Sequence, residues 1–347
     1  MKKFKVLDLF SGCGGLSLGF QDAGFEISLA IDNWADALQT FHSNHPNAKT
    51  LCEDLTKVDF PLIKNQYLNG EVDIVIGGPP CQGFSISGKR DPRDPRNKLS
   101  FSFIDAVKFF KPKAFVMENV PNFASMDGGK IKDKIILEFE SMGYLINFQK
   151  MLASDYGVPQ NRRRFFIVGL LERSKYDFPK GSTINEKVTT FEAISDLPEN
   201  SLNDGSQYPL EASSDYQRLM RRNSNEVHNH MITDHTEKTK SIIALVPDGG
   251  NYKDLPQSLK NTRRVNIAWT RYDSRKPSFT IDTGHRHHFH YSFNRVPTVR
   301  ESARLQSFPD DFIFKGSKTS QYKQVGNAVP PILSKAIATQ LLKHLPK

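Results

Sequence analysis

The sequence has few cysteines and lacks several features that would mark a class of protein. Its 347 residues hold three cysteines, Cys13, Cys52 and Cys81, at unrelated spacings and without a Cys-x-x-Cys pair. Zinc sites and disulfide frameworks use paired cysteines, so we expect neither metal nor disulfides and predict reduced, intracellular thiols. No apolar run approaches the roughly 20 residues that a membrane helix needs. We therefore predict a soluble, cytoplasmic protein with no membrane contact.

Positive charge is the main excess in the composition. Lys and Arg number 47 against 38 Asp and Glu, which gives a formal net charge of +9. Because each basic side chain placed at a phosphate releases condensed counterions, this surplus favours a polyanionic partner. The surplus is weak support by itself, since many basic proteins bind nothing acidic.

The first half of the chain alternates β-branched runs with amphipathic stretches, as βαβ units do. Strands are predicted at Lys5–Phe10, Ile27–Ile31, Val72–Ile76, Ala114–Met117 and Phe165–Gly169, and helices at Leu16–Ala23, Ala35–His42, Phe101–Phe110 and Ile131–Met142. The periodicity weakens from about Leu171 and returns near Arg295, with helices predicted at Val299–Gln306 and from Pro331 onward. We predict an α/β fold with a doubly wound, mostly parallel sheet, and domain segments 1–170, 171–294 and 295–347.

A glycine-rich loop, Phe10-Ser11-Gly12-Cys13-Gly14-Gly15, follows the first predicted strand and leads into a helix. Such a loop lets the backbone approach a ligand, although a tight turn with only packing duties is the alternative. Asp32 ends the next strand, where a carboxylate can accept ribose hydroxyls, and Trp34 beside it can stack on an adenine. Asp54, after a third strand, is placed for the adenine amino group. These features favour a nucleoside cofactor, and we predict S-adenosylmethionine.

The segment Gly77-Gly78-Pro79-Pro80-Cys81-Gln82-Gly83-Phe84-Ser85 follows the fourth strand. A free cysteine is usually an inert buried side chain, but two prolines between glycines form a rigid turn at the sheet edge where ligands bind. Amino-group methyltransferases tend to carry a polar residue and an aromatic around a proline pair. A cysteine in the place of the aromatic indicates methylation at carbon.

Carbon 5 of cytosine is too electron-poor to attack a sulfonium methyl until a thiolate has added at carbon 6. A carboxylic acid at ring nitrogen 3 eases that addition. Glu118, in Met117-Glu118-Asn119-Val120 at the end of the fifth strand, is a candidate for this acid. An ordinary salt-bridge acid is the alternative, but two complementary groups that end neighbouring strands argue against coincidence.

Arginines precede the last strand of the first half, in Gln160-Asn161-Arg162-Arg163-Arg164. Alternate residues of a strand share a face, so Arg162 and Arg164 are predicted to point the same way. One can reach the cytosine carbonyl oxygen, and the other a phosphate or the thiolate, whose pKa a cation would lower. A basic edge strand exposed to water is the alternative.

Taken in order, these motifs resemble the bacterial DNA cytosine-5 methyltransferase family over nearly the whole chain. The series is the glycine loop, Asp32, Asp54, Pro-Pro-Cys-Gln, Glu-Asn-Val and Gln160–Arg164, followed by Arg295–Pro309 and Gln324–Pro330. The resemblance implies a Rossmann-like S-adenosylmethionine-dependent fold in which 171–294 recognises the target and 295–347 completes the catalytic domain. One mild departure is Asp32 where glutamate is commoner, which shortens the reach to the ribose.

The resemblance also implies site residues. Catalysis falls to Cys81, Glu118, Arg162 and Arg164. Cofactor contacts fall to Phe10, Ser11, Gly12, Cys13, Gly14, Gly15, Leu16, Asp32, Asn33, Trp34, Asp54, Leu55, Pro79, Leu99, Asn327, Ala328 and Val329. The target base would be flipped out of duplex DNA, with the loop Gly83–Leu99 closing over it and Gln82 and Ser85 near the DNA. A monomer that protects host DNA beside a restriction endonuclease is expected.

Most histidines fall after Val227, and His285, His287, His288 and His290 form a cluster. Without cysteines or suitably spaced acids we predict no metal site, and we expect these residues near DNA beside Arg271 and Arg286.

Two other functions are weighed. A transfer-RNA cytosine-5 methyltransferase shares this fold, but that lineage carries a Cys-Phe-Thr tripeptide in its second half and this chain has no cysteine after Cys81. A catalytically inactive DNA-binding scaffold is the other, and the intact Cys81, Glu118, Arg162 and Arg164 argue against it.

Overall fold

The chain forms two compact units. The computed structural model describes residues 3–68, 70–80, 97–171, 175–260, 269–283 and 288–346. The first unit comprises Met1–Leu152, Arg163–Lys180 and Pro331–Lys347, and the second comprises Ala153–Arg162 and Gly181–Pro330. Within the described part of the chain, no helix is long and apolar enough to cross a membrane.

The first unit is built on a seven-stranded sheet with the order β3-β2-β1-β4-β5-β7-β6. Its strands are β1 (Lys5–Leu9), β2 (Glu26–Asp32), β3 (Lys49–Cys52), β4 (Ile74–Gly77), β5 (Ala114–Asn119), β6 (Tyr144–Leu152) and β7 (Arg163–Leu171). Neighbouring strands are parallel except that β7 runs antiparallel to both β5 and β6. The predicted mostly parallel α/β sheet is confirmed.

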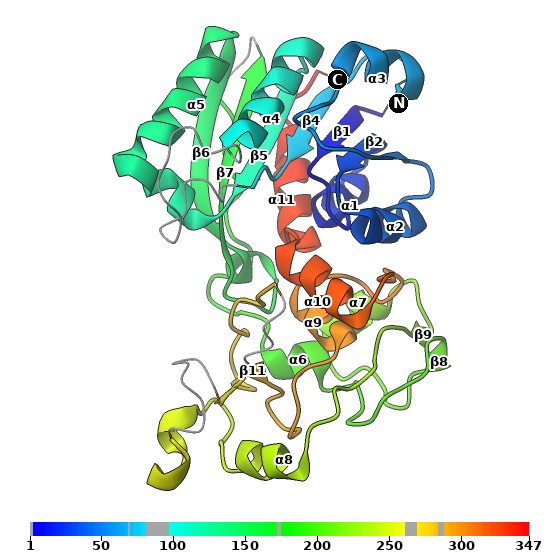
Figure 1. Cartoon of the computed structure of the whole chain (residues 1–347), viewed down its shortest axis with the longest axis vertical. Coiled ribbons are helices and arrows are strands. Elements are labelled where there is room, and N and C mark those ends of the chain that lie inside the picture. Colours follow the sequence, from blue (N-terminus) through cyan, green and yellow to red (C-terminus); the bar gives the residue numbers. More distant parts are fainter. Residues whose placement is uncertain are drawn as a thin grey trace. The chain divides into compact units, whose positions relative to one another are not determined.

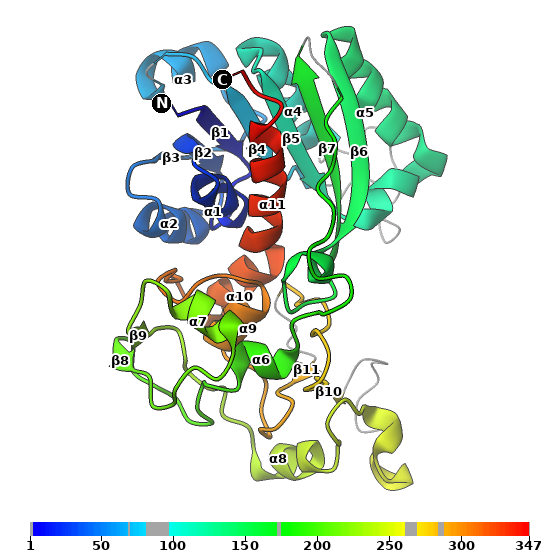
Figure 2. The same cartoon turned by 180° about the vertical axis from the view of Figure 1, so that it is seen from behind.

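Helices cover both faces of this sheet (Figures 1 and 2). They are α1 (Gly15–Asp22), α2 (Ala35–Asn44), α3 (Phe60–Tyr67), α4 (Asn97–Phe110), α5 (Lys130–Ser141) and α11 (Pro331–Leu342), with the 3₁₀ segment η2 (Pro121–Gly129) after β5. On one face, Ser334 of α11 donates its hydroxyl to the Leu16 carbonyl of α1 at 2.6 Å. The last helix of the chain is therefore part of the first unit.

The opposite face of the sheet packs on α3, α4 and α5. Alternate strand residues such as Leu7, Val75 and Phe115 point into this core and are fully buried. The Phe115 ring lies 4.1 Å from the Phe139 ring of α5 and 6.1 Å from the Phe103 ring of α4, measured between centroids. Each such aromatic contributes roughly 1.5–3 kcal/mol by burial. Because successive side chains of a strand point to opposite faces of the sheet, one set of alternate residues packs on α3, α4 and α5 and the other set faces the helices on the opposite side.

The second unit has little regular structure. Its elements are η3 (Ala153–Tyr156), α6 (Thr190–Ile194), β8 (Ser206–Gln207), α7 (Asp215–Arg221), β9 (Glu226–Val227), α8 (Glu237–Ala244), η4 (Tyr252–Asp254), η5 (Gln257–Leu259), β10 (Thr270–Arg271), β11 (His288–Phe289), α9 (Val299–Leu305) and α10 (Lys318–Asn327). Much of its interior is polar, because Arg300 and Arg304 are fully buried.

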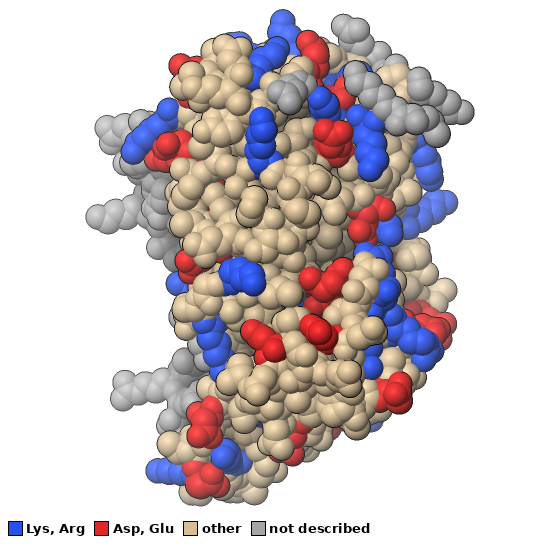
Figure 3. All heavy atoms as spheres, turned by 90° about the vertical axis from the view of Figure 1, so that its right-hand side faces the viewer, with Lys and Arg blue, Asp and Glu red and all other residues tan. Residues whose placement is uncertain are grey.

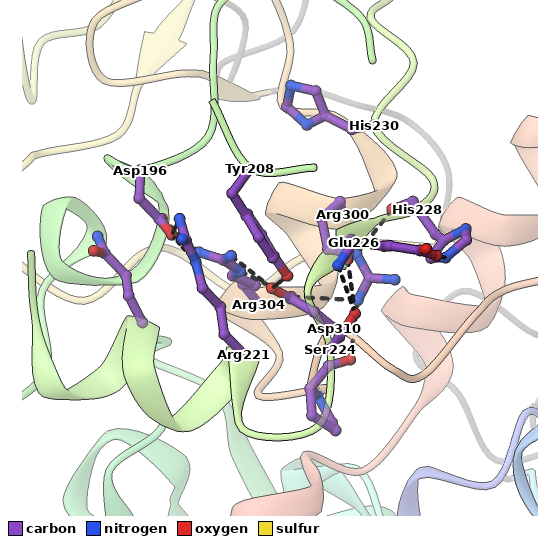
Figure 4. A network of polar contacts seen from close by, with 12 residues as sticks. Asp196, Tyr208, Arg221, Ser224, Glu226, His228, His230, Arg300, Arg304 and Asp310 are labelled. Carbon is purple, nitrogen blue, oxygen red and sulfur yellow. Dashed lines mark hydrogen bonds and ion pairs between the residues drawn. The ribbon is translucent and has the colours of Figure 1, made fainter. Parts of the chain in front are cut away.

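Arg304 is the centre of a buried ionic network in this unit (Figure 4). It donates to both oxygens of Asp310, at 2.9 and 2.6 Å, and to Asp196 at 2.5 Å. Asp196 also binds Arg221, and Asp310 accepts from Tyr208. Burial raises the pKa of Asp310, but Arg304, Arg300 and Tyr208 together hold that pKa below its ordinary value. Removing one member of such a network leaves an uncompensated buried charge.

Bounds expected from the sequence agree with these elements to within a few residues for the strands and helices of the first half. Two elements of the sheet, β3 and β6, had no predicted range. The structural units also divide the chain differently from the predicted segments, because residues 153–162 and 295–330 belong to the second unit. That the second unit recognises the target stays a prediction.

Candidate functional site

The glycine loop joins β1 to α1 in a conformation that requires glycine. Gly12 has φ 53° and Gly14, the residue that caps α1, has φ 96°, both in the left-handed region. The Gly12 N–H donates to Asp32 Oδ2 at 2.8 Å, and the Trp34 N–H donates to Asp32 Oδ1 at 2.8 Å. The predicted ribose-binding carboxylate therefore also ties the loop to the end of β2.

Asp32 and Asp54 stand in different electrostatic surroundings. Burial raises the pKa of Asp32, and backbone hydrogen bonds from Gly12 and Trp34 oppose this. Asp54 is only half-buried, and hydrogen bonds from the Thr56 backbone and hydroxyl lower its pKa. Leu55, another predicted contact, is buried. The two carboxylates end neighbouring strands, as the sequence predicts for a nucleoside site.

Cys13 of the glycine loop is not a nucleophile. The side chain is 3% exposed, and burial raises the pKa of its thiol to about 12. A thiol in that state is protonated near neutral pH and unreactive, because the thiolate is the attacking form. Cys52 is exposed at the end of β3.

Glu118, Asn119 and the glycine-proline turn after β4 form the second half of the site. Glu118 Oε1 pairs with Arg164 Nε at 2.7 Å, and both side chains are largely buried. Its other oxygen lies so close to Gly78 that a β-carbon built there would sit 2.8 Å away. Asn119 donates its side-chain amide to the Pro79 carbonyl at 3.0 Å. The structure thus brings Glu118 and Arg164 together beside the turn that precedes Cys81.

Gly78 and Asn119 stand within the predicted motifs, but the sequence alone does not indicate a role for them. Their role is geometric, since glycine admits the Glu118 carboxylate and Asn119 holds the turn. Burial lowers the pKa of Arg164, while Glu118 opposes that shift through its charge and hydrogen bond. An arginine retains its charge under such a shift, so Glu118 faces a permanent cation.

Arg162 lies one residue before β7 and belongs to the second unit, whereas Arg164 lies in β7 and belongs to the first. That the two arginines share a face stays a prediction. Arg162 is fully buried and donates to the Ile281 carbonyl at 3.2 Å and to the Gly326 carbonyl at 2.6 Å. These bonds link Arg162 to the segments around Ile281 and Gly326, which belong to the same unit.

Several other predicted cofactor contacts lie in the described part of the chain, and their contact with the cofactor stays a prediction. Pro79 is buried and Leu99, in α4, is half-buried. Asn327 ends α10, and Ala328 accepts from the Gln306 side chain at 2.6 Å. Asn327 to Val329 lie in the second unit. Cys81, Gln82, Ser85, Arg286, His285 and His287 lie outside the described residues, as does most of the Gly83–Leu99 loop.

The predicted DNA contact at Arg271 is wrong. The side chain is 3% exposed, and all five of its N–H groups donate within the protein, to the carbonyls of Ile243, Val246, His290 and Phe293 and to Asn294 Oδ1, each at 2.8 Å. A guanidinium has five donors, so none is left for a phosphate or base.

His290 is likewise a buried structural residue and not a DNA contact. It is 0% exposed, and its Nδ1 accepts from the Ser292 and Phe293 amides at 3.1 Å. Burial lowers the pKa of His290 to about 3, so the ring is neutral. Among the described residues, no group of His, Cys, Asp or Glu has the arrangement of a metal site.

Basic side chains do not gather into one patch on the face that Figure 3 shows, where Lys and Arg alternate with Asp and Glu. The net charge of +9 is therefore not concentrated there.

Comparison with known proteins extends this geometry. Residues 4–343 match the family model described as C-5 cytosine-specific DNA methylase. The chain is 39% identical to the Type II methyltransferase M.DdeI of Desulfomicrobium norvegicum, over 97% of this chain and 88% of the relative. It is also 39% identical to the Type II methyltransferase M1.HphI of Haemophilus parahaemolyticus, over 97% of this chain and 86% of the relative.

Solved structures agree. A DNA modification methyltransferase encoded within an E. coli prophage is 29% identical, with a TM-score of 0.83 over 99% of this chain and 100% of that chain. The S. pombe Dnmt2 methyltransferase is 16% identical, with a TM-score of 0.60 over 99% of both chains, a likeness that bears on the fold alone.

Proposed function

Since this chain belongs to the C-5 cytosine-specific DNA methylase family, we propose that it methylates cytosine through a covalent bond formed by Cys81. The family resemblance predicted from the motifs is confirmed, and so is the enzyme class, a DNA cytosine-5-methyltransferase. The family implies S-adenosylmethionine as methyl donor.

One observation supports the covalent mechanism more than any other. Glu118 Oε1 pairs with Arg164 at 2.7 Å, and Glu118 Oε2 lies against Gly78, three residues before Cys81. An acid held at this point can serve ring nitrogen 3 of a cytosine whose carbon 6 meets the thiol. Arg164 fixes the carboxyl group through one oxygen, so the other is the one that can face the base.

The residues of the glycine loop and its neighbours fit the proposed cofactor. Gly12 and Gly14 keep the backbone free of side chains, and Asp32, Trp34 and Asp54 stand at the ends of β2 and β3. S-adenosylmethionine would supply an electrophilic methyl group on a sulfonium. Asp32 would hold the ribose, Trp34 the adenine ring and Asp54 the adenine amino group.

The proposed chemistry balances as follows. The Cys81 thiolate adds to carbon 6 while ring nitrogen 3 gains a proton from Glu118. The resulting enamine carbon 5 would take the methyl group as the methyl–sulfur bond of the sulfonium breaks, and S-adenosylhomocysteine would be the leaving group. Carbon 5 then loses its proton to a base, and the thiolate leaves by elimination as nitrogen 3 returns its proton. Glu118 must therefore be protonated at the first step and accept that proton at the last.

The finer parts of the function rest on resemblance and chemistry. The target base would be flipped out of the duplex, because carbon 6 is stacked inside it. Segment 171–294 would read the DNA word. The Type II names of M.DdeI and M1.HphI support pairing with a restriction endonuclease, and a monomer without a metal would suffice.

The covalent step can be tested with duplex DNA that carries 5-fluorocytosine at the target. Fluorine cannot leave carbon 5 as a cation, so the adduct should persist through denaturing electrophoresis and should need S-adenosylmethionine. The Cys81→Ser variant should form no adduct, whereas Cys52→Ser, at an exposed cysteine, should form it as the wild type does. Fluorinated transfer RNA is the control for the alternative substrate. An adduct that survives in Cys81→Ser, or that forms only on RNA, would overturn the proposal.

A further inference from the structure

His45 is a buried histidine that lies directly against the glycine loop. It follows the last residue of α2 and is 1% exposed. Its Nδ1 lies 2.9 Å from Gln21 Oε1 in α1, and its ring packs on Phe41 of α2 with centroids 4.3 Å apart. The ring therefore has a defined place between the two helices that flank the loop.

The contact with the loop is made at Gly14. A β-carbon built on Gly14 would lie 2.6 Å from His45 Nε2 and 2.8 Å from Phe41 Cδ2. Real β-carbons do not approach other atoms this closely, and Gly14 also has φ 96°. The imidazole thus occupies the space in which any other residue at position 14 would place its side chain.

The imidazole is neutral under ordinary conditions. Burial lowers the pKa of His45 to about 4, against which the Gly14 backbone and the charge of Asp22 act more weakly. A neutral imidazole offers one donor and one acceptor. Because Gln21 Oε1 is an acceptor 2.9 Å from Nδ1, Nδ1 is the nitrogen that can donate.

The loop is therefore held at two points by one β-strand and the helix that follows it. Asp32, at the end of β2, accepts from the Gly12 amide at 2.8 Å, and His45, at the end of α2, abuts Gly14. Between them lies the turn Gly12–Gly14, which leads to the first amides of α1. Loops fixed before binding lose less conformational entropy when a ligand arrives.

We propose that His45 is a positioning residue for the cofactor, which fixes the left-handed Gly14 so that the glycine loop is already in its binding conformation. This inference rests on the proposed cofactor site and adds a residue to it that touches the loop and not the ligand. It differs from the role of Asp32, which would contact the ribose as well as the loop.

The first test measures binding of S-adenosylhomocysteine to the full chain by calorimetry. His45→Ala should raise the Kd by about tenfold, the size expected when one or two residues must be ordered on binding. His42→Ala is the matched control, because His42 lies in the last turn of the same helix and is exposed. Its Kd should equal that of the wild type, and neither variant should change the Kd for DNA.

Two further measurements separate positioning from a general loss of stability. At saturating S-adenosylmethionine, His45→Ala should recover the wild-type kcat while its KM for the cofactor stays raised. His45→Asn and His45→Gln, which place a polar amide where the imidazole was, should restore part of the affinity, and they also serve if His45→Ala does not fold. An equal Kd for His45→Ala and wild type, or a lowered kcat with an unchanged KM, would overturn the inference.

A double-mutant cycle tests the contact itself. Gly14→Ala should weaken cofactor binding because of the clash and the positive φ, and part of this loss should disappear when His45 is also replaced by Ala. Residues in direct contact couple in this way, whereas independent sites add. Strict additivity would overturn the inference. Failure of the wild type to bind S-adenosylhomocysteine would instead overturn the proposed function.

Discussion

Replacing Arg304 with Met should strongly destabilise the second unit. Arg304 is fully buried and makes three hydrogen bonds to the carboxylates of Asp310 and Asp196. Breaking a buried pair by removing one partner costs about 3–5 kcal/mol. Asp196 keeps Arg221, and Asp310 keeps Arg300 at 3.7 Å, so the lower end of that range, about 3 kcal/mol, is expected here. For a unit of this size each kcal/mol lowers Tm by about 2–4 °C, so the fall should be roughly 6–12 °C.

Thermal melts followed by circular dichroism, together with urea titrations, measure this loss on the full chain. Arg218→Met is the matched control, because Arg218 also pairs with an aspartate, Asp215, but its side chain is 57% exposed. Surface substitutions of that kind stay within about 0.5 kcal/mol. Arg304→Lys should fall between the two, since it keeps the charge but not the guanidinium fork. If Arg304→Met melted together with Arg218→Met, the network would not be the stabilising element inferred from its burial.

Three further predictions concern packing, pH and an assigned contact. Gly19→Val should lower the melting temperature of the first unit, because a β-carbon at Gly19 would lie 2.4 Å from Ser334 Cβ. Stability measured by urea at a series of pH values should fall below about pH 6.5, since burial lowers the pKa of His290 from 6.5 to about 3 and the unfolded chain takes up that proton first. It should fall further below about 4.5, because Arg295 lowers the pKa of Glu301 to about 2 despite burial. Constant stability across these windows would contradict both pKa shifts. Arg271→Lys should destabilise by about 1–3 kcal/mol for each carbonyl left without a donor, yet leave the salt dependence of DNA binding unchanged.

The first half of the sheet could be predicted from the sequence because its signals are local. The near-continuous apolar runs in β1, β2 and β5 indicate strands covered on both faces, and glycines at a strand end indicate a close-approach turn. Edge strand β6 was missed for the opposite reason. Its segment Tyr144–Leu152 carries Asn147, Gln149 and Lys150, and only one of its edges is paired. Nothing in such a stretch distinguishes a strand from a polar helix or loop.

The candidate site could be predicted where a motif and its partner end neighbouring strands, as with Glu118. The contact between Glu118 and Arg164 joins residues 46 positions apart across an antiparallel pairing, Glu118 opposite Phe166. Sequence reasoning placed the two groups but not their order in space. The strand was predicted from Phe165, with Arg162 and Arg164 before it, whereas β7 begins at Arg163 and so includes Arg164.

The second unit resisted prediction because arginine was interpreted as a surface residue. Arginine is rarely buried unless its donors are met, and the five partners of Arg271 come from two stretches that lie far apart in the sequence, 243–246 and 290–294. Such partners leave no periodic trace in the sequence. The assignment of Arg271 to DNA failed for this reason. A basic residue in a predicted recognition segment can contact DNA at the surface or donate to buried carbonyl groups, and composition does not distinguish these two roles.

A shared physical requirement explains why this unit buries arginines at all. A segment with short helices and two-residue strands leaves many carbonyl groups without a ladder partner, and a buried carbonyl without a donor is costly. Arg271 serves four carbonyls and Arg300 serves those of His228, Pro309 and Phe312. One guanidinium thus supplies hydrogen-bond donors to loop carbonyls, as the N–H groups of a neighbouring strand do in a sheet. Arg304 differs from these two arginines because most of its N–H groups donate to carboxylates, those of Asp310 and Asp196. It also donates to the Ala193 carbonyl. Irregular backbone can therefore form a defined interior here, provided that the arginines are retained. Lysine could not replace them, because its single ammonium group does not reproduce the planar fork of five donors.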